Sequence, residues 1–202
     1  MGIYSTKSLW QKVLKPIVTI SVQYQVHPDV FTYSAVIISI VGAVGLYLAR
    51  TSHAWLWILP PCVLLRLTLN LLDGLVARER QLADTFGELK NEFGDRVADV
   101  AIFLGLALGG YVDTRLVLIS LSLILCVSYL GILGKAMTGE RVYSGIFGKG
   151  DRMISLAVFT FYPAISGNLN SFDWYLALAS IAALTTIIQR VRTIHGNAQS
   201  IR

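Results

Sequence analysis

The chain has 202 residues, 54% of them hydrophobic and only 14% charged, whereas a soluble domain carries about 25% charged residues. Its net charge of +5 would suit nucleic-acid binding in a soluble chain, but basic flanks of membrane helices account for it here. We therefore exclude a soluble enzyme and a nucleic-acid-binding protein, and predict an all-α integral membrane protein with residues 1–202 as one domain.

The first predicted element is an amphipathic helix within residues 1–20. Its apolar residues, from Leu9 to Ile17, share one helical face, whereas Lys12 and Lys15 fall largely on the other. A helix of this kind lies in the membrane interface, with its apolar face toward the acyl chains.

Six membrane-spanning helices are predicted to follow, because the later apolar runs approach the roughly 20 residues that cross a bilayer core. They cover approximately residues 28–49, 55–78, 91–110, 114–135, 151–165 and 174–191. Pro60 and Pro61 either kink the second span or mark its true beginning. Of the 17 Lys and Arg residues, only Arg50 and Arg115 fall in the loops of one side, and Arg66 lies within the second span. This asymmetry predicts that both termini are cytoplasmic.

The turn between the second and third spans carries polar residues at helical spacing. Those that share one helical face are Asn70 and Asp73 in the second span, and Asn91, Asp95 and Asp99 in the third. Residues three or four positions apart lie on one face of a helix. Because a short turn makes the two helices antiparallel neighbours, we expect both polar faces to converge near the cytoplasmic surface.

Carboxylates at this depth need a positive partner, because one Asp in a membrane helix costs about 2.5–3.5 kcal/mol on insertion scales. Oxygen-rich sites suit a hard divalent cation such as Mg²⁺, which carboxylates commonly hold together with substrate phosphates. The pattern therefore favours metal-assisted phosphoryl transfer. In a purely structural alternative, Asp99 pairs with Arg96 or Arg152, and Asn70 joins two helices by a hydrogen bond.

A second basic group lies between the fourth and fifth spans, at Lys149 and Arg152. Asp151 is a candidate cap for the fifth span, so both basic side chains fall at a helix N-terminus, where anions bind readily. The alternative is that these residues anchor the loop to lipid head groups.

The segment from Asn70 to Asp95 resembles the signature of the CDP-alcohol phosphotransferase (CDP-alcohol phosphatidyltransferase) family. That signature is D-x-x-D-G-x-x-A-R, then about eight residues, then G-x-x-x-D-x-x-x-D. The positions that match in register are Asp73, Gly74, Ala77, Arg78, Gly87 and Asp95. The layout of six spans with the signature at the second turn is also similar, so the resemblance covers nearly the whole chain.

The resemblance implies a membrane transferase of phospholipid biosynthesis. Such an enzyme moves a substituted phosphate group, here a phosphatidyl group, from a CDP-alcohol such as CDP-diacylglycerol to an acceptor alcohol and releases CMP. Members bind one or two Mg²⁺ or Mn²⁺ ions through the signature aspartates, and many are homodimers. We expect a multi-pass protein of a bacterial inner membrane, with membrane lipids around it and the active site facing the cytoplasm.

The resemblance also assigns roles to individual residues. The expected metal ligands are Asn70, Asp73, Asn91 and Asp95. The expected nucleotide-binding residues are Asp73, Gly74, Ala77, Arg78 and Gly87. Asp95 is expected to be the general base, with Asp99 as the substitute candidate, and Lys149 and Arg152 are expected to bind the acceptor or its phosphate. These basic residues favour an anionic acceptor, whose identity the sequence leaves open.

Two positions depart from the signature, because Asn70 and Asn91 stand where the family has aspartate. The site could bind metal through these four residues with help from Asp99 or Glu92, or could bind one ion together with the nucleotide phosphates. In a third case the chain is an inactive CDP-alcohol-binding pseudoenzyme. A small transporter is a further alternative, but it predicts inverted repeats and midplane acids, and the sequence has no repeat.

Overall fold

The computed structural model describes residues 7–200, and every regular element in that range is a helix. The α-helices are α1 (Lys7–Gln23), α2 (Pro28–Leu48), α3 (Leu59–Glu79), α4 (Thr85–Gly109), α5 (Thr114–Thr138), α6 (Lys149–Ser166) and α7 (Ser171–Ser200), and a 3₁₀ helix, η2 (His53–Ile58), precedes α3. The predicted all-α fold is thus confirmed.

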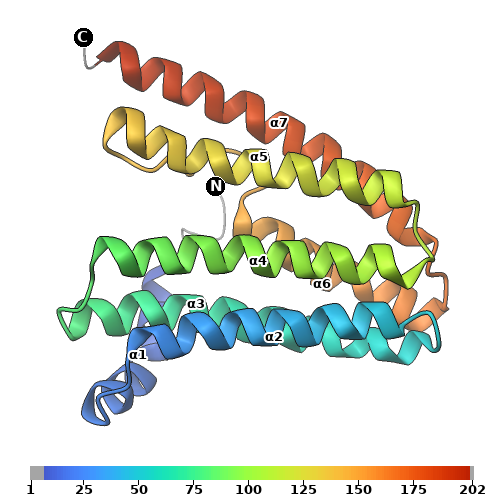
Figure 1. The fold of residues 1–202 in the computed structure, drawn as a ribbon, viewed down its shortest axis with the longest axis horizontal. Coiled ribbons are helices and arrows are strands. Elements are labelled where there is room, and N and C mark those ends of the chain that lie inside the picture. The colour runs from blue at the N-terminus through green and yellow to red at the C-terminus, as the bar shows by residue number, and fades with distance from the viewer. Residues whose placement is uncertain (1–6, 201–202) are drawn as a thin grey trace.

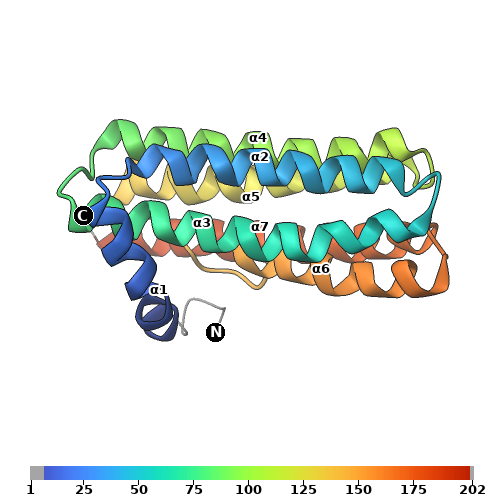
Figure 2. The same cartoon turned by 90° about the horizontal axis from the view of Figure 1, so that it is seen from below.

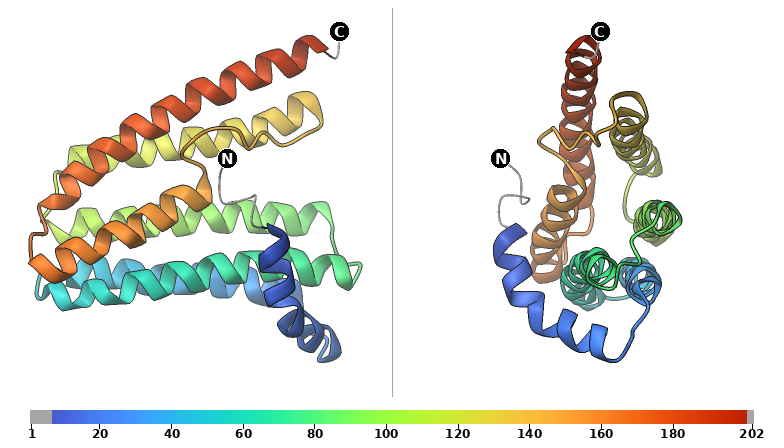
Figure 3. Two further views of the ribbon diagram at one scale, coloured as in Figure 1. Left: turned by 180° about the vertical axis from the view of Figure 1, so that it is seen from behind. Right: turned by 90° about the vertical axis from the view of Figure 1, so that its left-hand side faces the viewer.

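Helices α2 to α7 lie side by side as a bundle, and α1 crosses one end of it (Figure 1, Figure 2). α2 packs on both α3 and α4, and α5 packs along α7. α6 contacts both α3 and α7 and lies between them (Figure 3). The turn from α3 to α4 is at the same end of the bundle as α1 (Figure 1).

Within residues 7–200, four helical segments are long and apolar enough to cross a membrane, judged by length and composition. These are Pro28–Leu48, His53–Glu79, Thr114–Thr138 and Ser171–Gln199. α4 and α6 lie within the same bundle, but the first half of α4 and the first turn of α6 carry ionisable residues. Their membrane-spanning role therefore stays a prediction.

The helix boundaries follow local signals. α3 begins at Leu59 with its prolines in the first turn, where a missing backbone N–H costs no hydrogen bond. Pro60 and Pro61 thus mark a helix start. α4 begins at Thr85, not near residue 91 as predicted, because Asp84 caps it by accepting a hydrogen bond from the Gly87 N–H at 2.6 Å.

α1 matches the predicted N-terminal helix from Lys7 onward, and residues 1–6 lie outside the described part of the chain. The side chains of Leu9 and Lys12 also lie outside it. Leu14 and Val18 are buried against α3. The outward residues include exposed Val13 and Ile17. An interfacial location of α1 stays a prediction.

Gly105 sets the spacing between α2 and α4. A methyl group at this position would overlap the backbone carbonyl of Ala43. We expect Gly105→Ala to destabilise the protein by about 1–3 kcal/mol, the usual cost of overpacking. Thermal unfolding of the purified protein in detergent measures the effect. Gly196→Ala is the matched control, because no heavy atom lies within 4 Å of its added methyl. Equal melting temperatures for both variants would contradict this account of the packing.

Candidate functional site

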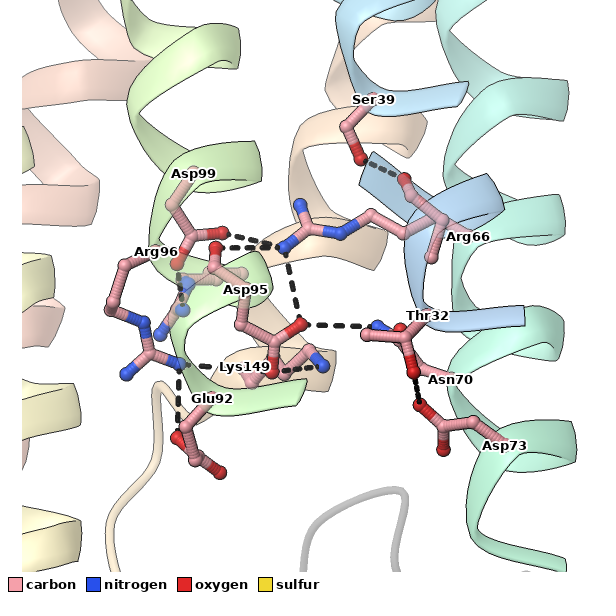
Figure 4. A network of polar contacts seen from close by, with 12 residues as sticks. Thr32, Ser39, Arg66, Asn70, Asp73, Glu92, Asp95, Arg96, Asp99 and Lys149 are labelled. Atoms are coloured by element: carbon pink, nitrogen blue, oxygen red, sulfur yellow. Dashed lines mark hydrogen bonds and ion pairs between the residues drawn. The ribbon is translucent and has the colours of Figure 1, made fainter. Parts of the chain in front are cut away.

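The polar faces of α3 and α4 do converge. The Asn70 side-chain amide donates a hydrogen bond to Oδ1 of Asp95 at 3.2 Å (Figure 4). The Asp95 side chain is buried, although it lies on a helix with many charged residues. The two helices are joined by a turn of only five residues, 80–84, so they run antiparallel. Residues at similar distances from this turn therefore lie side by side on the two helices.

Lys149, one of the two basic residues at the start of α6, contacts a signature residue of α4. Its Nζ donates a hydrogen bond to Oδ2 of Asp95 at 2.5 Å (Figure 4). Lys149 is the first residue of α6, whose start is stabilised by the Asp151 carboxylate accepting from the Gly148 N–H at 3.1 Å. The expected cap therefore exists, and it places the lysine beside the signature residues.

Asp99 is held by two arginines. Its Oδ1 accepts a hydrogen bond from Nη2 of Arg66 at 3.0 Å, and its Oδ2 is bonded to Nη2 of Arg152. All three side chains are at most 5% exposed. The pairing of Asp99 with Arg152, one of the structural alternatives, is therefore present. It leaves no oxygen of Asp99 without a basic partner.

Arg66 belongs to the site, although the sequence-based prediction gave it no role there. It donates to the backbone oxygen of Asp95 at 3.2 Å as well as to Asp99, so it ties two successive turns of α4 to α3. The sequence signal for it is its place in an otherwise apolar run, four residues before Asn70 and seven before Asp73. That spacing puts all three on one helical face.

Asp73 is buried and only partly satisfied. Thr32 of α2 donates a hydrogen bond to its Oδ2 at 3.1 Å, while its Oδ1 has no hydrogen-bond partner. Oδ1 of Asn91 is likewise buried without a partner. Asn91 lies around a tightly packed polar depression together with Thr32, Asn70 and Asp95. Unsatisfied buried oxygens are costly, so these two positions favour a bound cation.

The chemical types of these unpartnered oxygens suit a hard divalent cation. The two unpartnered oxygens offer one carboxylate and one carboxamide, and oxygen donors of this kind suit Mg²⁺ or Mn²⁺. Among the described residues, no three His, Cys, Asp or Glu side chains are grouped to hold a metal ion. Two of the four expected ligands are asparagines. Oxygen atoms from outside these four residues therefore have to complete the coordination of a divalent ion.

Glu92 and Arg96 lie on the far side of Asp95 from Asp73 (Figure 4). Oε2 of Glu92 is 3.6 Å from Nη2 of Arg96, and its Oε1 contacts Arg141. Oε2 of Glu92 is buried and has no hydrogen-bond partner, whereas both oxygens of Asp99 are bonded to arginines. A contribution of Glu92 to a metal site stays a prediction.

The remaining signature residues lie toward the end of α3 and the start of α4. Gly74 has only the Arg78 guanidinium within 4 Å of an added methyl group, and Arg78 is exposed. Gly87 has a local role, because a side chain there would lie 2.9 Å from the capping oxygen of Asp84. The nucleotide-binding roles of Gly74, Ala77, Arg78 and Gly87 stay predictions.

A small, mainly apolar pocket adjoins the polar network. Arg66, Asp99 and Arg152 form its polar edge, and its remaining lining is mainly aliphatic and aromatic, including Leu59 and Phe103. The site therefore combines buried charged groups with apolar side chains beside them.

Comparison with known proteins places these features in a family. The family model described as CDP-alcohol phosphatidyltransferase matches residues 25–188. The inner membrane protein YnbA of Escherichia coli is 31% identical over 198 residues, covering 96% of each chain. Phosphatidylinositol phosphate synthase of Mycolicibacterium smegmatis is 27% identical, over 95% of this chain and 89% of its own. Archaetidylinositol phosphate synthase of Aeropyrum pernix is 31% identical, over 97% and 98%.

Solved structures share the fold. The phosphatidylinositol phosphate synthase of Mycobacterium tuberculosis with CDP-DAG bound superposes with a TM-score of 0.70 at 24% identity, covering 91% of this chain and 94% of that one. The same enzyme in complex with manganese and citrate gives a TM-score of 0.68 at 24% identity, with coverage of 89% and 87%.

Proposed function

Because this chain belongs to the CDP-alcohol phosphatidyltransferase family, we propose that it transfers a phosphatidyl group from CDP-diacylglycerol to a phosphorylated polyol. Family membership makes it a membrane transferase of phosphate-containing groups in phospholipid synthesis. The main observation behind this proposal is that the Asp95 carboxylate accepts hydrogen bonds from both Asn70 of α3 and Lys149 of α6. This contact joins the signature and the basic loop in one buried site.

The reaction is a displacement at the phosphorus that bears the lipid alcohol. The acceptor oxygen forms a bond to this β-phosphorus, while the bond from phosphorus to the bridging oxygen breaks and CMP leaves with the electron pair. The acceptor hydroxyl gives its proton to Asp95, the proposed general base. Asp99 holds Arg66 and Arg152 in place, because both of its oxygens are already bonded to them.

Mg²⁺ or Mn²⁺ is the proposed metal cofactor, held by oxygens of Asp73 and Asn91, with Asn70 and Asp95 beside them. When bound, it supplies charge neutralisation at the donor pyrophosphate. The unpartnered oxygens of Asp73 and Asn91 support this role, as does the manganese in the related mycobacterial structure.

The donor assignment is supported by the apolar lining of the pocket beside Arg66 and Arg152, since apolar side chains next to bound phosphates suit the lipid part of the donor. The related structure with CDP-DAG bound supports the same donor. Arg78, with Gly74 and Ala77, is proposed to contact the cytidine at the open end of α3. Gly87 is assigned to the same region by its place in the signature.

An anionic acceptor is supported by the local charge. The ionisable groups of the network are Arg66, Arg96, Arg141, Lys149 and Arg152, with Asp73, Glu92, Asp95 and Asp99. Basic residues thus exceed acidic ones by one even before a divalent ion is added. Two relatives are named as synthases of phosphatidylinositol phosphate and archaetidylinositol phosphate, which makes inositol phosphate the first acceptor to test.

The proposed setting is a bacterial inner membrane, as for the Escherichia coli relative. α4 and α6 are proposed as further spans beside the four apolar ones, with both termini and the site cytoplasmic according to the distribution of Lys and Arg. A homodimer is proposed from the family resemblance alone.

A CMP-release assay tests the function. Purified protein with Mg²⁺ or Mn²⁺, CDP-diacylglycerol and inositol phosphate should form CMP, and uncharged inositol should support a slower rate. Glycerol phosphate and serine complete the acceptor panel. CDP-diacylglycerol binding without CMP release for any acceptor would indicate the pseudoenzyme. Failure to bind the donor at all would contradict the family assignment of the site and reopen the transporter alternative.

A further inference from the structure

The carboxylates near the proposed catalytic centre differ in what already neutralises them. Asp99 is bonded to Arg66 and Arg152 through its two oxygens, and all three side chains are buried. A buried charge set of this kind is held together by its own pairing, and removal of one partner is strongly unfavourable. Asp99 is therefore not an available metal ligand in this chain.

Asp95 is also saturated with donors, but its principal partner is a lysine. Oδ1 accepts from the Asn70 amide at 3.2 Å and Oδ2 accepts from Lys149 Nζ at 2.5 Å. Arg66 and Arg96 lie further away, each 3.7 Å from an Asp95 oxygen. The ammonium of Lys149 thus occupies a position on Asp95 where a metal ion would otherwise neutralise the carboxylate.

Few oxygens of the proposed metal ligands are without a hydrogen-bond partner. Among the buried side-chain oxygens of the proposed ligand set, only Asp73 Oδ1 and Asn91 Oδ1 lack a partner in the described residues. Asp73 is the only one of these two that carries a charge. A second divalent ion would need further anionic ligands, and Asn70 and Asn91 remove two of them from the family signature.

We propose that this site takes a single divalent cation, at Asp73 and Asn91, and that the ammonium of Lys149 is the second positive charge of the centre. The proposal rests on the proposed function, because it specifies the cation set of that reaction. A lysine ammonium is a compact point charge that binds phosphate oxygens as well as carboxylates. Lys149 passes from Asp95 to a phosphate oxygen when the donor binds, which frees Asp95 to accept the hydroxyl proton.

Metal binding tests the proposal without turnover. The full-length protein in detergent is stripped of metal and titrated with Mn²⁺ in the presence of CDP, and the electron paramagnetic resonance signal of free Mn²⁺ gives the bound ion per chain. The wild-type protein should bind one ion. Lys149→Met should tighten Mn²⁺ binding by about tenfold or more, because it removes a positive charge close to the metal. Lys149→Arg keeps the charge and should bind Mn²⁺ like the wild type.

The matched control is Lys135→Met, because Lys135 is half-exposed and pairs with Glu88 at 2.5 Å, outside the site. It should leave the stoichiometry and affinity for Mn²⁺ unchanged. A triple variant that carries Asn70→Asp, Asn91→Asp and Lys149→Met should bind a second ion. Two ions or none in the wild-type protein would overturn the single-cation site, and an unchanged affinity in Lys149→Met would overturn the role of the lysine. These outcomes are independent of CMP release, which tests the function itself.

Discussion

Replacing Asp95 with asparagine should lower the rate of CMP release by about 10²- to 10⁴-fold, the usual contribution of a general base. Asparagine has nearly the same shape and keeps an oxygen that can accept from Asn70 or Lys149, the two donors now 3.2 Å and 2.5 Å away. It cannot take up the proton of the acceptor hydroxyl. The rate with saturating donor and acceptor, measured by CMP formation, gives the effect.

Glu88→Gln is the matched control for this variant. It makes the same carboxylate-to-amide change on α4, at an exposed residue that pairs with Lys135, and should leave CMP release unchanged. Melting temperatures of both variants show whether a rate loss reflects unfolding. An Asp95→Asn protein that turns over at the wild-type rate would remove Asp95 from the role of base.

Replacing Asp99 with asparagine should have its largest effect on stability, with a loss of about 3–5 kcal/mol in the free energy of unfolding. Arg66 and Arg152 are 3% and 5% exposed, so the change removes the carboxylate that bonds both buried guanidinium groups and leaves Arg66 with only the more distant Asp95 carboxylate at 3.7 Å. Unfolding of the purified protein in mixed micelles, followed by circular dichroism, measures the loss.

A triple variant separates charge from packing. Asp99→Leu with Arg66→Met and Arg152→Met removes all three charges, and apolar replacements of a buried ion cluster are often neutral or stabilising. This variant should unfold closer to the wild type than Asp99→Asn does. If Asp99→Asn is as stable as the wild type but cannot release CMP, then Asp99 is the base and the assignment of the two aspartates has to be exchanged.

The main helices and one shared polar face were predictable from the sequence because both depend on local spacing. Apolar runs of membrane length predicted six spans, and among the described residues four helical segments are long and apolar enough to cross a membrane. Asn70 and Asp95 were expected to face each other because a short turn constrains two helices strongly, and their side chains are hydrogen bonded. α4 begins at Thr85, before the predicted span of residues 91–110, because Asp84 caps the helix there.

The pairing of the basic side chains with the aspartates depended on the tertiary structure. Lys149 is 54 residues from Asp95, and Arg66 and Arg152 are 33 and 53 residues from Asp99. No periodicity in one helix can indicate which of several basic residues crosses to another helix, because the choice depends on how α3, α4 and α6 pack and on which side chains reach the same depth.

The feature that the sequence by itself determined is therefore the signature on α3 and α4, with its two asparagines and the chemistry that its oxygens suit. Only the tertiary structure decided how the charges are matched: Asp99 with two arginines, Asp95 with Lys149, and one free oxygen each on Asp73 and Asn91. The physical reason is that spacing along a helix sets which residues share a face, whereas the pairing of buried charges is set by contacts between helices that are distant in the chain.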